Sequence, residues 1–124
     1  MDKRIIEKIR KDFKPFYKKT LGILVYGSLA SETNDNRSDI DICIVAPDYN
    51  PLRLYRETLL FNYDIRIFET MPLFLKMQVI ENHKIIYSKD IYDLYEYFYR
   101  FRKIWKDQRY RQRLSKEELI DMFD

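Results

Sequence analysis

The feature that most constrains the fold is a pair of short strand-like segments, one of which ends at a glycine-serine turn and the other of which begins with aspartates. An apolar run over residues 20–26 stops at Gly27-Ser28, and Gly27 is one of only two glycines in the chain. From residue 39 the chain alternates between an apolar side, with Ile40, Ile42 and Ile44, and a second side with Asp39, Asp41 and Cys43. A period of two is typical of a strand. These segments predict one strand that leads into a turn and one strand with an acidic end.

Other segments show the spacing of helices and strands. Helices are predicted over residues 2–13, 51–60, from Thr70 to about Ile80, and from 90 to about 112, and strands over residues 63–68 and 84–87. The third helix is expected to have Thr70 as its N-cap and Pro72 in its first turn. The sequence Ser115-Lys116-Glu117-Glu118 fits a capping box, which predicts that a last short helix begins there.

Composition limits the chemistry that this chain can support. Its 124 residues, 46% of them hydrophobic, predict one domain with a buried core. Cys43 and His83 are the single cysteine and histidine, which excludes an internal disulfide and a thiolate-rich zinc site, and both are expected to be structural. No apolar run approaches the ~18 residues of a membrane span, so we expect a cytoplasmic protein without a membrane partner. Because the chain has one cysteine and one histidine, any catalytic or metal-binding chemistry must rest on carboxylates.

Gly27 and Ser28 have the character of a phosphate-binding turn. A glycine at the end of a buried strand lets the backbone turn sharply, and a serine that starts a helical segment offers a hydroxyl and free N–H groups. Both features suit phosphate oxygens. Ser28 would also cap a following helix with the same geometry, and the two roles are compatible.

Three aspartates are candidates for a metal site. Asp39 and Asp41 lie two residues apart on one strand, so their carboxylates point to the same face, where a divalent cation would offset their repulsion. Mg²⁺ fits, because it takes one or two protein carboxylates together with substrate oxygens. If the strand of Asp64 lies beside them, its carboxylate completes a two-metal site and can take a proton from an attacking hydroxyl. Glu69 is the alternative third acid, and a solvated strand end is the alternative reading of the aspartates.

These residues resemble the signature of the minimal nucleotidyltransferases of the DNA polymerase β superfamily: glycine-serine, about ten residues, Asp-x-Asp, and a later aspartate. The matching positions are Gly27-Ser28, Asp39-Ile40-Asp41 and Asp64. The resemblance implies an α/β fold with a small mixed sheet flanked by helices, and a single nucleotidyltransferase domain over residues 1–124, with its core at about 20–87 and a helical extension over 88–124.

The same resemblance implies roles for individual residues. Gly27 and Ser28 would bind the phosphates of ATP, Asp39 and Asp41 would hold two Mg²⁺ ions, and Asp64 would be the third acid. Ser31 stands where the family often has an arginine. One phosphate-side positive charge is therefore either missing or supplied by Arg37 or Arg66.

Small members of this kind often act as antitoxins that transfer AMP from ATP to a tyrosine of a helical HEPN ribonuclease toxin. The leading hypothesis is therefore a protein adenylyltransferase with a HEPN toxin as partner. A second hypothesis is a non-catalytic antitoxin or adaptor that binds through the helix over residues 90–113. A third is nucleotidyl transfer to a small molecule, such as an aminoglycoside, or to RNA ends, and the short chain argues against it because it leaves little room for an acceptor pocket.

The predicted C-terminal helix combines tyrosines with basic residues. Residues 100–113 hold seven basic side chains against Asp107 alone, and the chain has eleven tyrosines. Tyrosine and arginine are favoured at protein interfaces. The surface formed by Tyr95, Tyr99, Arg102 and Arg109 is the predicted protein-docking site, with RNA as a competing ligand and an ordinary solvated or packed helix as the alternative.

Overall fold

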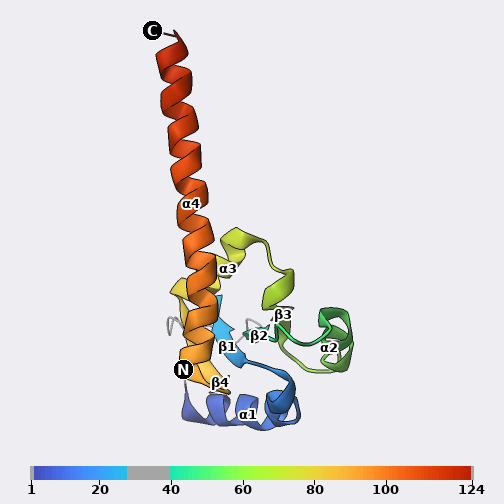
Figure 1. Ribbon diagram of the computed structural model, residues 1–124. Coiled ribbons are helices and arrows are strands. Elements are labelled where there is room, and N and C mark those ends of the chain that lie inside the picture. The colour runs from blue at the N-terminus through green and yellow to red at the C-terminus, as the bar shows by residue number, and fades with distance from the viewer. Residues whose placement is uncertain (1, 28–39, 124) are drawn as a thin grey trace.

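A computed structural model describes residues 2–27 and 40–123, with side chains up to residue 111. Figure 1 shows a sheet with helices on both of its faces and a long helix that extends away from the body. The strands are β1 (Gly22–Tyr26), β2 (Asp41–Val45), β3 (Asp64–Ile67) and β4 (His83–Ser88). The helices are α1 (Lys3–Phe13), η1 (Lys14–Lys19), α2 (Pro51–Glu57), η3 (Phe68–Thr70), α3 (Leu73–Glu81) and α4 (Ile91–Phe123).

The described strands form one sheet in the order β3-β2-β1-β4. β1 pairs antiparallel with β2 and with β4, whereas β2 and β3 are parallel. The predicted α/β class, with a small mixed sheet flanked by helices, is therefore confirmed. The parallel pair matters most for function, because the first residues of β2 and β3 lie next to each other at the same end of the sheet.

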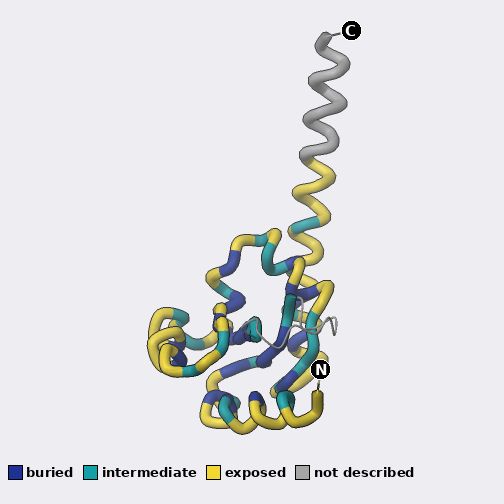
Figure 2. Tube along the Cα trace, turned by 180° about the vertical axis from the view of Figure 1, so that it is seen from behind, coloured by how far each residue is buried: buried dark blue, intermediate teal, exposed yellow. Residues whose placement is uncertain are grey.

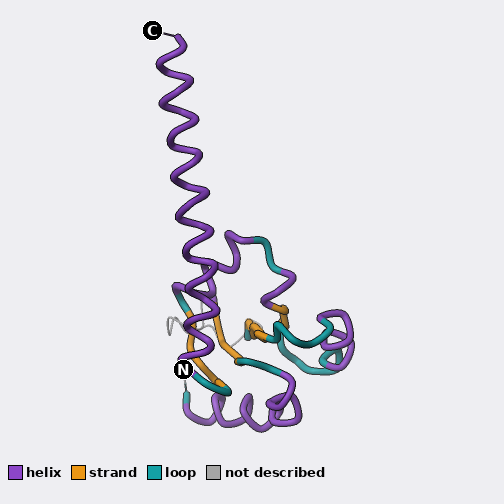
Figure 3. Tube along the Cα trace, viewed as in Figure 1, coloured by secondary structure: helices purple, strands orange, loops and turns teal. Residues whose placement is uncertain are grey.

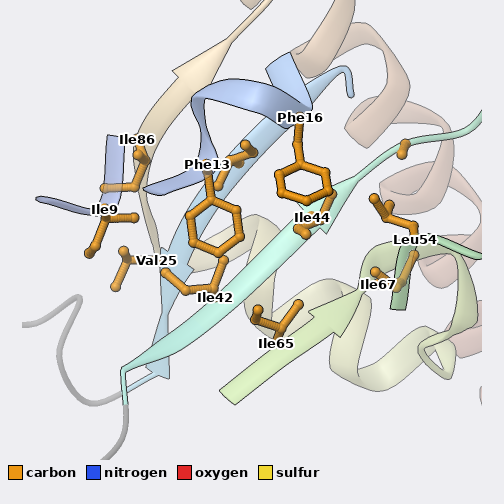
Figure 4. Close-up of a cluster of buried hydrophobic side chains, with 12 residues drawn as sticks. Ile9, Phe13, Phe16, Val25, Ile42, Ile44, Leu54, Ile65, Ile67 and Ile86 are labelled. Carbon is orange, nitrogen blue, oxygen red and sulfur yellow. The ribbon is translucent and has the colours of Figure 1, made fainter. Parts of the chain in front are cut away.

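The alternation seen in the sequence separates two hydrophobic clusters. On one face, Ile42 and Ile44 pack with side chains of α1, η1 and α2, as Figure 4 shows for Phe13 and Phe16. On the other face, the cluster is built from β1, β2, η3, α3 and α4, and includes Leu24, Cys43, Phe68, Val79, Leu94 and Phe98. Figure 2 shows the buried residues concentrated along the strands and the inner sides of these helices. The acidic side of β2 therefore faces α3 and α4.

The start of α3 differs from the prediction. Thr70 does not cap the helix; its hydroxyl donates to the carbonyl of Ile67 at 2.9 Å, and Pro72 is the N-cap. The cause is Pro72, because the residue before a proline is pushed into extended backbone. Met71 has φ −75° and ψ 143°, so the helix cannot begin before residue 73. α2 also ends at Glu57, a few residues earlier than predicted.

The predicted break at Ser115 is wrong, because α4 runs without interruption from Ile91 to Phe123. Its first turn is capped by Asp90, whose carboxylate accepts from the N–H groups of Tyr92 and Asp93 at 2.9 and 3.2 Å. Residues 90–124 contain neither glycine nor proline. A serine inside a helix costs only a few tenths of a kcal/mol, which is too little to end one.

α4 reaches well beyond the rest of the molecule. Its 33 residues span about 50 Å, and Figure 3 shows that only the first part lies against other elements. Among the described residues, no helix is both long enough and apolar enough to cross a membrane.

Candidate active site

The structure brings Asp41 and Asp64 together at one edge of the sheet. They are paired in the parallel register of β2 and β3, and the N–H of Asp64 donates to the carbonyl of Ile40 at 3.0 Å. Side chains at the same register position of neighbouring strands point to the same face, with the strands about 4.8 Å apart. Asp64 is exposed and Asp41 is half-buried. The two carboxylates thus stand side by side at the surface.

Gly27 closes the site from the β1 side. Its φ is +79°, a conformation that residues with a Cβ rarely adopt. A Cβ at this position would lie 2.7 Å from Oδ2 of Asp41. Glycine is therefore required twice, once for the turn after β1 and once to leave space for the Asp41 carboxylate.

A cleft of about 460 Å³ opens in front of Gly27 and Asp41, whereas Asp64 lines a separate hollow of about 100 Å³ next to it in the strand register. Tyr26, Gly27 and Asp41 line it from the sheet, and Arg66 lines it from β3, two residues after Asp64 and on the same face. The opposite wall comes from α3 and its C-cap and includes Gln78, Glu81 and Asn82. The cleft therefore joins the carboxylates of Asp41 and Glu81, a guanidinium and two side-chain amides, which suits a charged ligand with polar groups.

Tyr26 is held in its protonated form. Burial raises the pKa of the Tyr26 phenol, and the negative charges of Asp41 and Asp64 raise it further, while Arg66 opposes the shift. The Tyr26 phenol therefore lies within electrostatic range of Asp41, Asp64 and Arg66. At neutral pH Tyr26 can donate a hydrogen bond into the cleft.

The other predicted site residues lie outside the described residues. This holds for Ser28 and Asp39, and also for Ser31 and Arg37. Within residues 2–27 and 40–111, no group of three or more His, Cys, Asp or Glu side chains could hold a metal ion. Asp41 and Asp64 alone offer hard oxygen donors on adjacent strands, a set that suits Mg²⁺ when substrate oxygens complete it. The donor chemistry of the described residues fits this ion.

Glu69, the alternative third acid, is far from this cleft. Its carboxylate accepts from the N–H of Ala46 at 2.9 Å and from the hydroxyl of Tyr97 at 2.8 Å. Ala46 follows the last residue of β2, roughly 16 Å along the strand from Asp41. Burial raises the pKa of Glu69, although these hydrogen bonds and Lys76 oppose the shift. The alternative assignment of Glu69 is therefore wrong.

Cys43 and His83 have structural environments, as predicted. Cys43 lies on the same face as Asp41 but is fully buried, and burial raises the pKa of its thiol well above the usual value. Nδ1 of His83 lies 2.7 Å from the carbonyl oxygen of Val79, and its ring packs edge-on against Phe98. Neither residue lines the cleft.

Sequence reasoning missed five residues that line the cleft: Tyr26, Leu75, Gln78, Glu81 and Asn82. A signal for Gln78 and Asn82 was present, because they lie four residues apart, the first inside α3 and the second at its C-cap. Residues with this spacing share one helix face. Only the tertiary arrangement shows that this face points toward Asp41.

Comparisons with known proteins agree with this geometry. The model of the family described as "Polymerase beta, Nucleotidyltransferase" matches residues 7–92. A Methanocaldococcus jannaschii protein, named as a candidate protein adenylyltransferase, is 48% identical over 95 residues, which cover 77% of each chain.

Solved structures of toxin–antitoxin complexes share the fold. A chain of a complex with AMP-PNP has a TM-score of 0.66 at 20% identity, covering 93% of this chain and 98% of that chain. A chain from the complex of a tri-AMPylated Shewanella oneidensis HEPN toxin with its MNT antitoxin has a TM-score of 0.66 at 16% identity, covering 97% and 99%. The family match spans more than half of the sequence, and the chain therefore belongs to the polymerase β nucleotidyltransferase family.

Proposed function

We propose that this protein is an adenylyltransferase antitoxin, which transfers AMP from ATP to a tyrosine hydroxyl on a HEPN-type toxin. The observation that carries the proposal is the register of Asp41 beside Asp64, next to the glycine turn at residue 27. Further support comes from the adenylyltransferase name of the 48% identical relative and from the toxin–antitoxin complexes that share the fold. We further propose that the protein acts in the cytoplasm.

We assign the site residues as follows. Gly27 and Ser28 bind the triphosphate, and Asp39, Asp41 and Asp64 hold Mg²⁺. Mg²⁺, when bound, supplies positive charge that neutralises the phosphate oxygens and favours ionisation of a nearby hydroxyl. Arg66 supplies the positive charge that the family often has in an arginine at the position of Ser31. Its side chain lines the same cleft as Asp41.

The reaction is an in-line displacement at the α-phosphorus of ATP. The acceptor oxygen forms a bond to this phosphorus, the bond to the bridging oxygen breaks, and pyrophosphate leaves. Asp64 accepts the proton of the acceptor hydroxyl on its carboxylate, which suits its exposed position beside Asp41. Tyr26 donates a hydrogen bond to a phosphate oxygen in the cleft.

The direct test is transfer of label from α-³²P-ATP, with Mg²⁺, to the protein encoded by the neighbouring gene. Wild type should label that protein, and Asp41→Asn should not. Asp48→Asn is the matched control, because Asp48 lies in the turn after the opposite end of β2 and should leave transfer unchanged. A stable complex without labelling would instead favour the non-catalytic antitoxin, and labelling by Asp41→Asn would remove the site assignment.

A further inference from the structure

α4 carries two parallel stripes of side chains with the same spacing. The inner stripe is Leu94, Phe98, Phe101 and Trp105, and the outer stripe is Tyr95, Tyr99, Arg102, Lys106 and Arg109. Both follow steps of four and three residues, which keep side chains on one side of a helix. The outer stripe is about 21 Å long.

The two stripes differ in burial. Leu94 is fully buried and Phe98 is 2% exposed, whereas Tyr95 and Tyr99 are 48% and 58% exposed. Arg102, Lys106 and Arg109 are exposed as well. The inner stripe packs α4 against the body of the protein, and the outer stripe, which has the same spacing, is left exposed by the described residues.

The outer stripe is also positively charged. Among the described residues, Arg102, Lys106 and Arg109 form no ion pair. Asp107 is the only acidic residue between positions 97 and 116, and it points away from the stripe, since it follows Lys106 by about 100° around the helix. The charge of the stripe is therefore available to an acidic partner.

The outer stripe begins beside the active cleft. The ring of Tyr95 lies 6.4 Å from the ring of His83, and His83 pairs with Tyr26 in the register of β4 and β1. Tyr26 lines the cleft with Asp41. A protein bound along the stripe would therefore begin next to His83, whose register partner Tyr26 lines the cleft with Asp41.

We propose that the outer stripe is the docking surface for an acidic helical face of the protein that accepts AMP. This inference rests on the proposed function and adds the means by which the acceptor is recognised. Tyrosine and arginine supply the aromatic and bidentate contacts that dominate many interfaces, and the heptad-like spacing suits packing against a helix. The match to the nucleotidyltransferase family ends at residue 92, so the stripe lies beyond the matched catalytic region.

Two other occupants fit less well. A second copy of the chain would bring like charges together when two stripes pair in parallel, and in either orientation its stripe has no acidic residue to neutralise these cations. RNA prefers a groove with stacking aromatics along its path, whereas the cations of this stripe lie at one end and the tyrosines at the other.

The test uses two triple charge reversals in the full-length protein. R102E/K106E/R109E alters the outer stripe, and R100E/K103E/R111E makes the same charge change on the rest of the helix surface. Binding to the protein that accepts AMP is measured by calorimetry, with Mg·ATP binding to each variant as a check of the catalytic core. We expect the stripe variant to bind about tenfold or more weakly, the control to stay within about threefold, and Mg·ATP affinity to be unchanged in both.

The outcomes separate this inference from the proposed function. Wild-type binding without AMP transfer would refute the proposed function alone. If both triple variants weaken binding equally, or if neither weakens it, the docking stripe is refuted, whether or not AMP transfer persists. Two further results would also overturn it: a 20-nucleotide RNA that binds through the stripe more tightly than the protein does, or a dimer of wild type that the stripe variant loses.

Discussion

The two ends of β2 place carboxylates in opposite surroundings. At its start, Asp41 pairs in register with Asp64 and lines a cleft, with Gly27 leaving room for the Asp41 oxygens. Beyond its last residue, Glu69 is held by the N–H of Ala46 and the hydroxyl of Tyr97, away from that cleft. The same chemical group therefore serves a ligand site at one end and the fold at the other. Partners and exposure, more than residue type, decide which.

The largest effect is expected from removing the proton acceptor at the first end. Asp64→Asn keeps the size of the side chain but removes its basicity, and general-base catalysis is worth roughly 10²–10⁴ in rate. AMP transfer should fall by about that factor, with thermal unfolding unchanged because Asp64 is exposed. Single-turnover transfer, compared with Asp90→Asn or Asp48→Asn, measures it. A rate within a few-fold of wild type would exclude Asp64 as the base.

A methyl group at Gly27 should disturb both the site and the turn. Gly27→Ala places a Cβ 2.7 Å from Asp41 Oδ2 at a φ of +79°. We expect loss of about 100-fold in transfer rate, because misplacing a reacting group by about 1 Å has that cost. Left-handed backbone costs an additional ~1 kcal/mol of stability. Gly22→Ala is the control for adding a methyl to β1: its Cβ would lie 3.3 Å from the buried side chain of Leu94 and 3.4 Å from a carbonyl, contacts that a shift of a few tenths of an ångström relieves.

At the second end, the expected effect is on stability. Glu69→Ala leaves the N–H of Ala46 and the hydroxyl of Tyr97 without their acceptor, and each buried unsatisfied group costs about 1–3 kcal/mol. Urea unfolding should show this loss, while transfer measured well below the melting temperature should stay within about twofold of wild type. Tyr97→Phe removes one of the two hydrogen bonds and should cost less. A large drop in transfer by the folded Glu69→Ala variant would contradict the separation of the two ends.

The two ends of β2 also differ in how far the sequence predicts them. The strands, the cysteine in the core and the aspartate motif follow from local alternation and spacing, because each signal lies within a few residues. The hydrogen bonds of Glu69 join it to residues 23 and 28 positions away, and no local pattern indicates such pairing.

The two wrong predictions of helix starts, at Thr70 and at Ser115, have local causes. In each case a nearby residue pattern outweighed the residue that could have capped a helix. Thr70 has the right chemistry for a cap, but Pro72 controls the backbone before it. The capping-box residues at 115–118 are equally compatible with a helix interior, and nothing in residues 90–124 breaks the helix. The cleft wall formed by Gln78 and Asn82 depends on how α3 crosses the sheet, which only tertiary packing determines.

The smallest predicted effect is the pH dependence that Glu69 adds to stability. Burial raises the pKa of Glu69 in the folded protein above its unfolded value of about 4.3, so in this range the folded state binds more protons at this carboxyl. Its contribution is fully present below the unfolded pKa and is lost as pH rises through the folded pKa. The free energy of unfolding of wild type, relative to Glu69→Gln, should therefore decline from pH 4 upward and level off above the folded pKa. Urea titrations of both proteins between pH 4 and 8 measure this difference, and an increase with pH would mean that the hydrogen bonds to the carboxylate outweigh its burial.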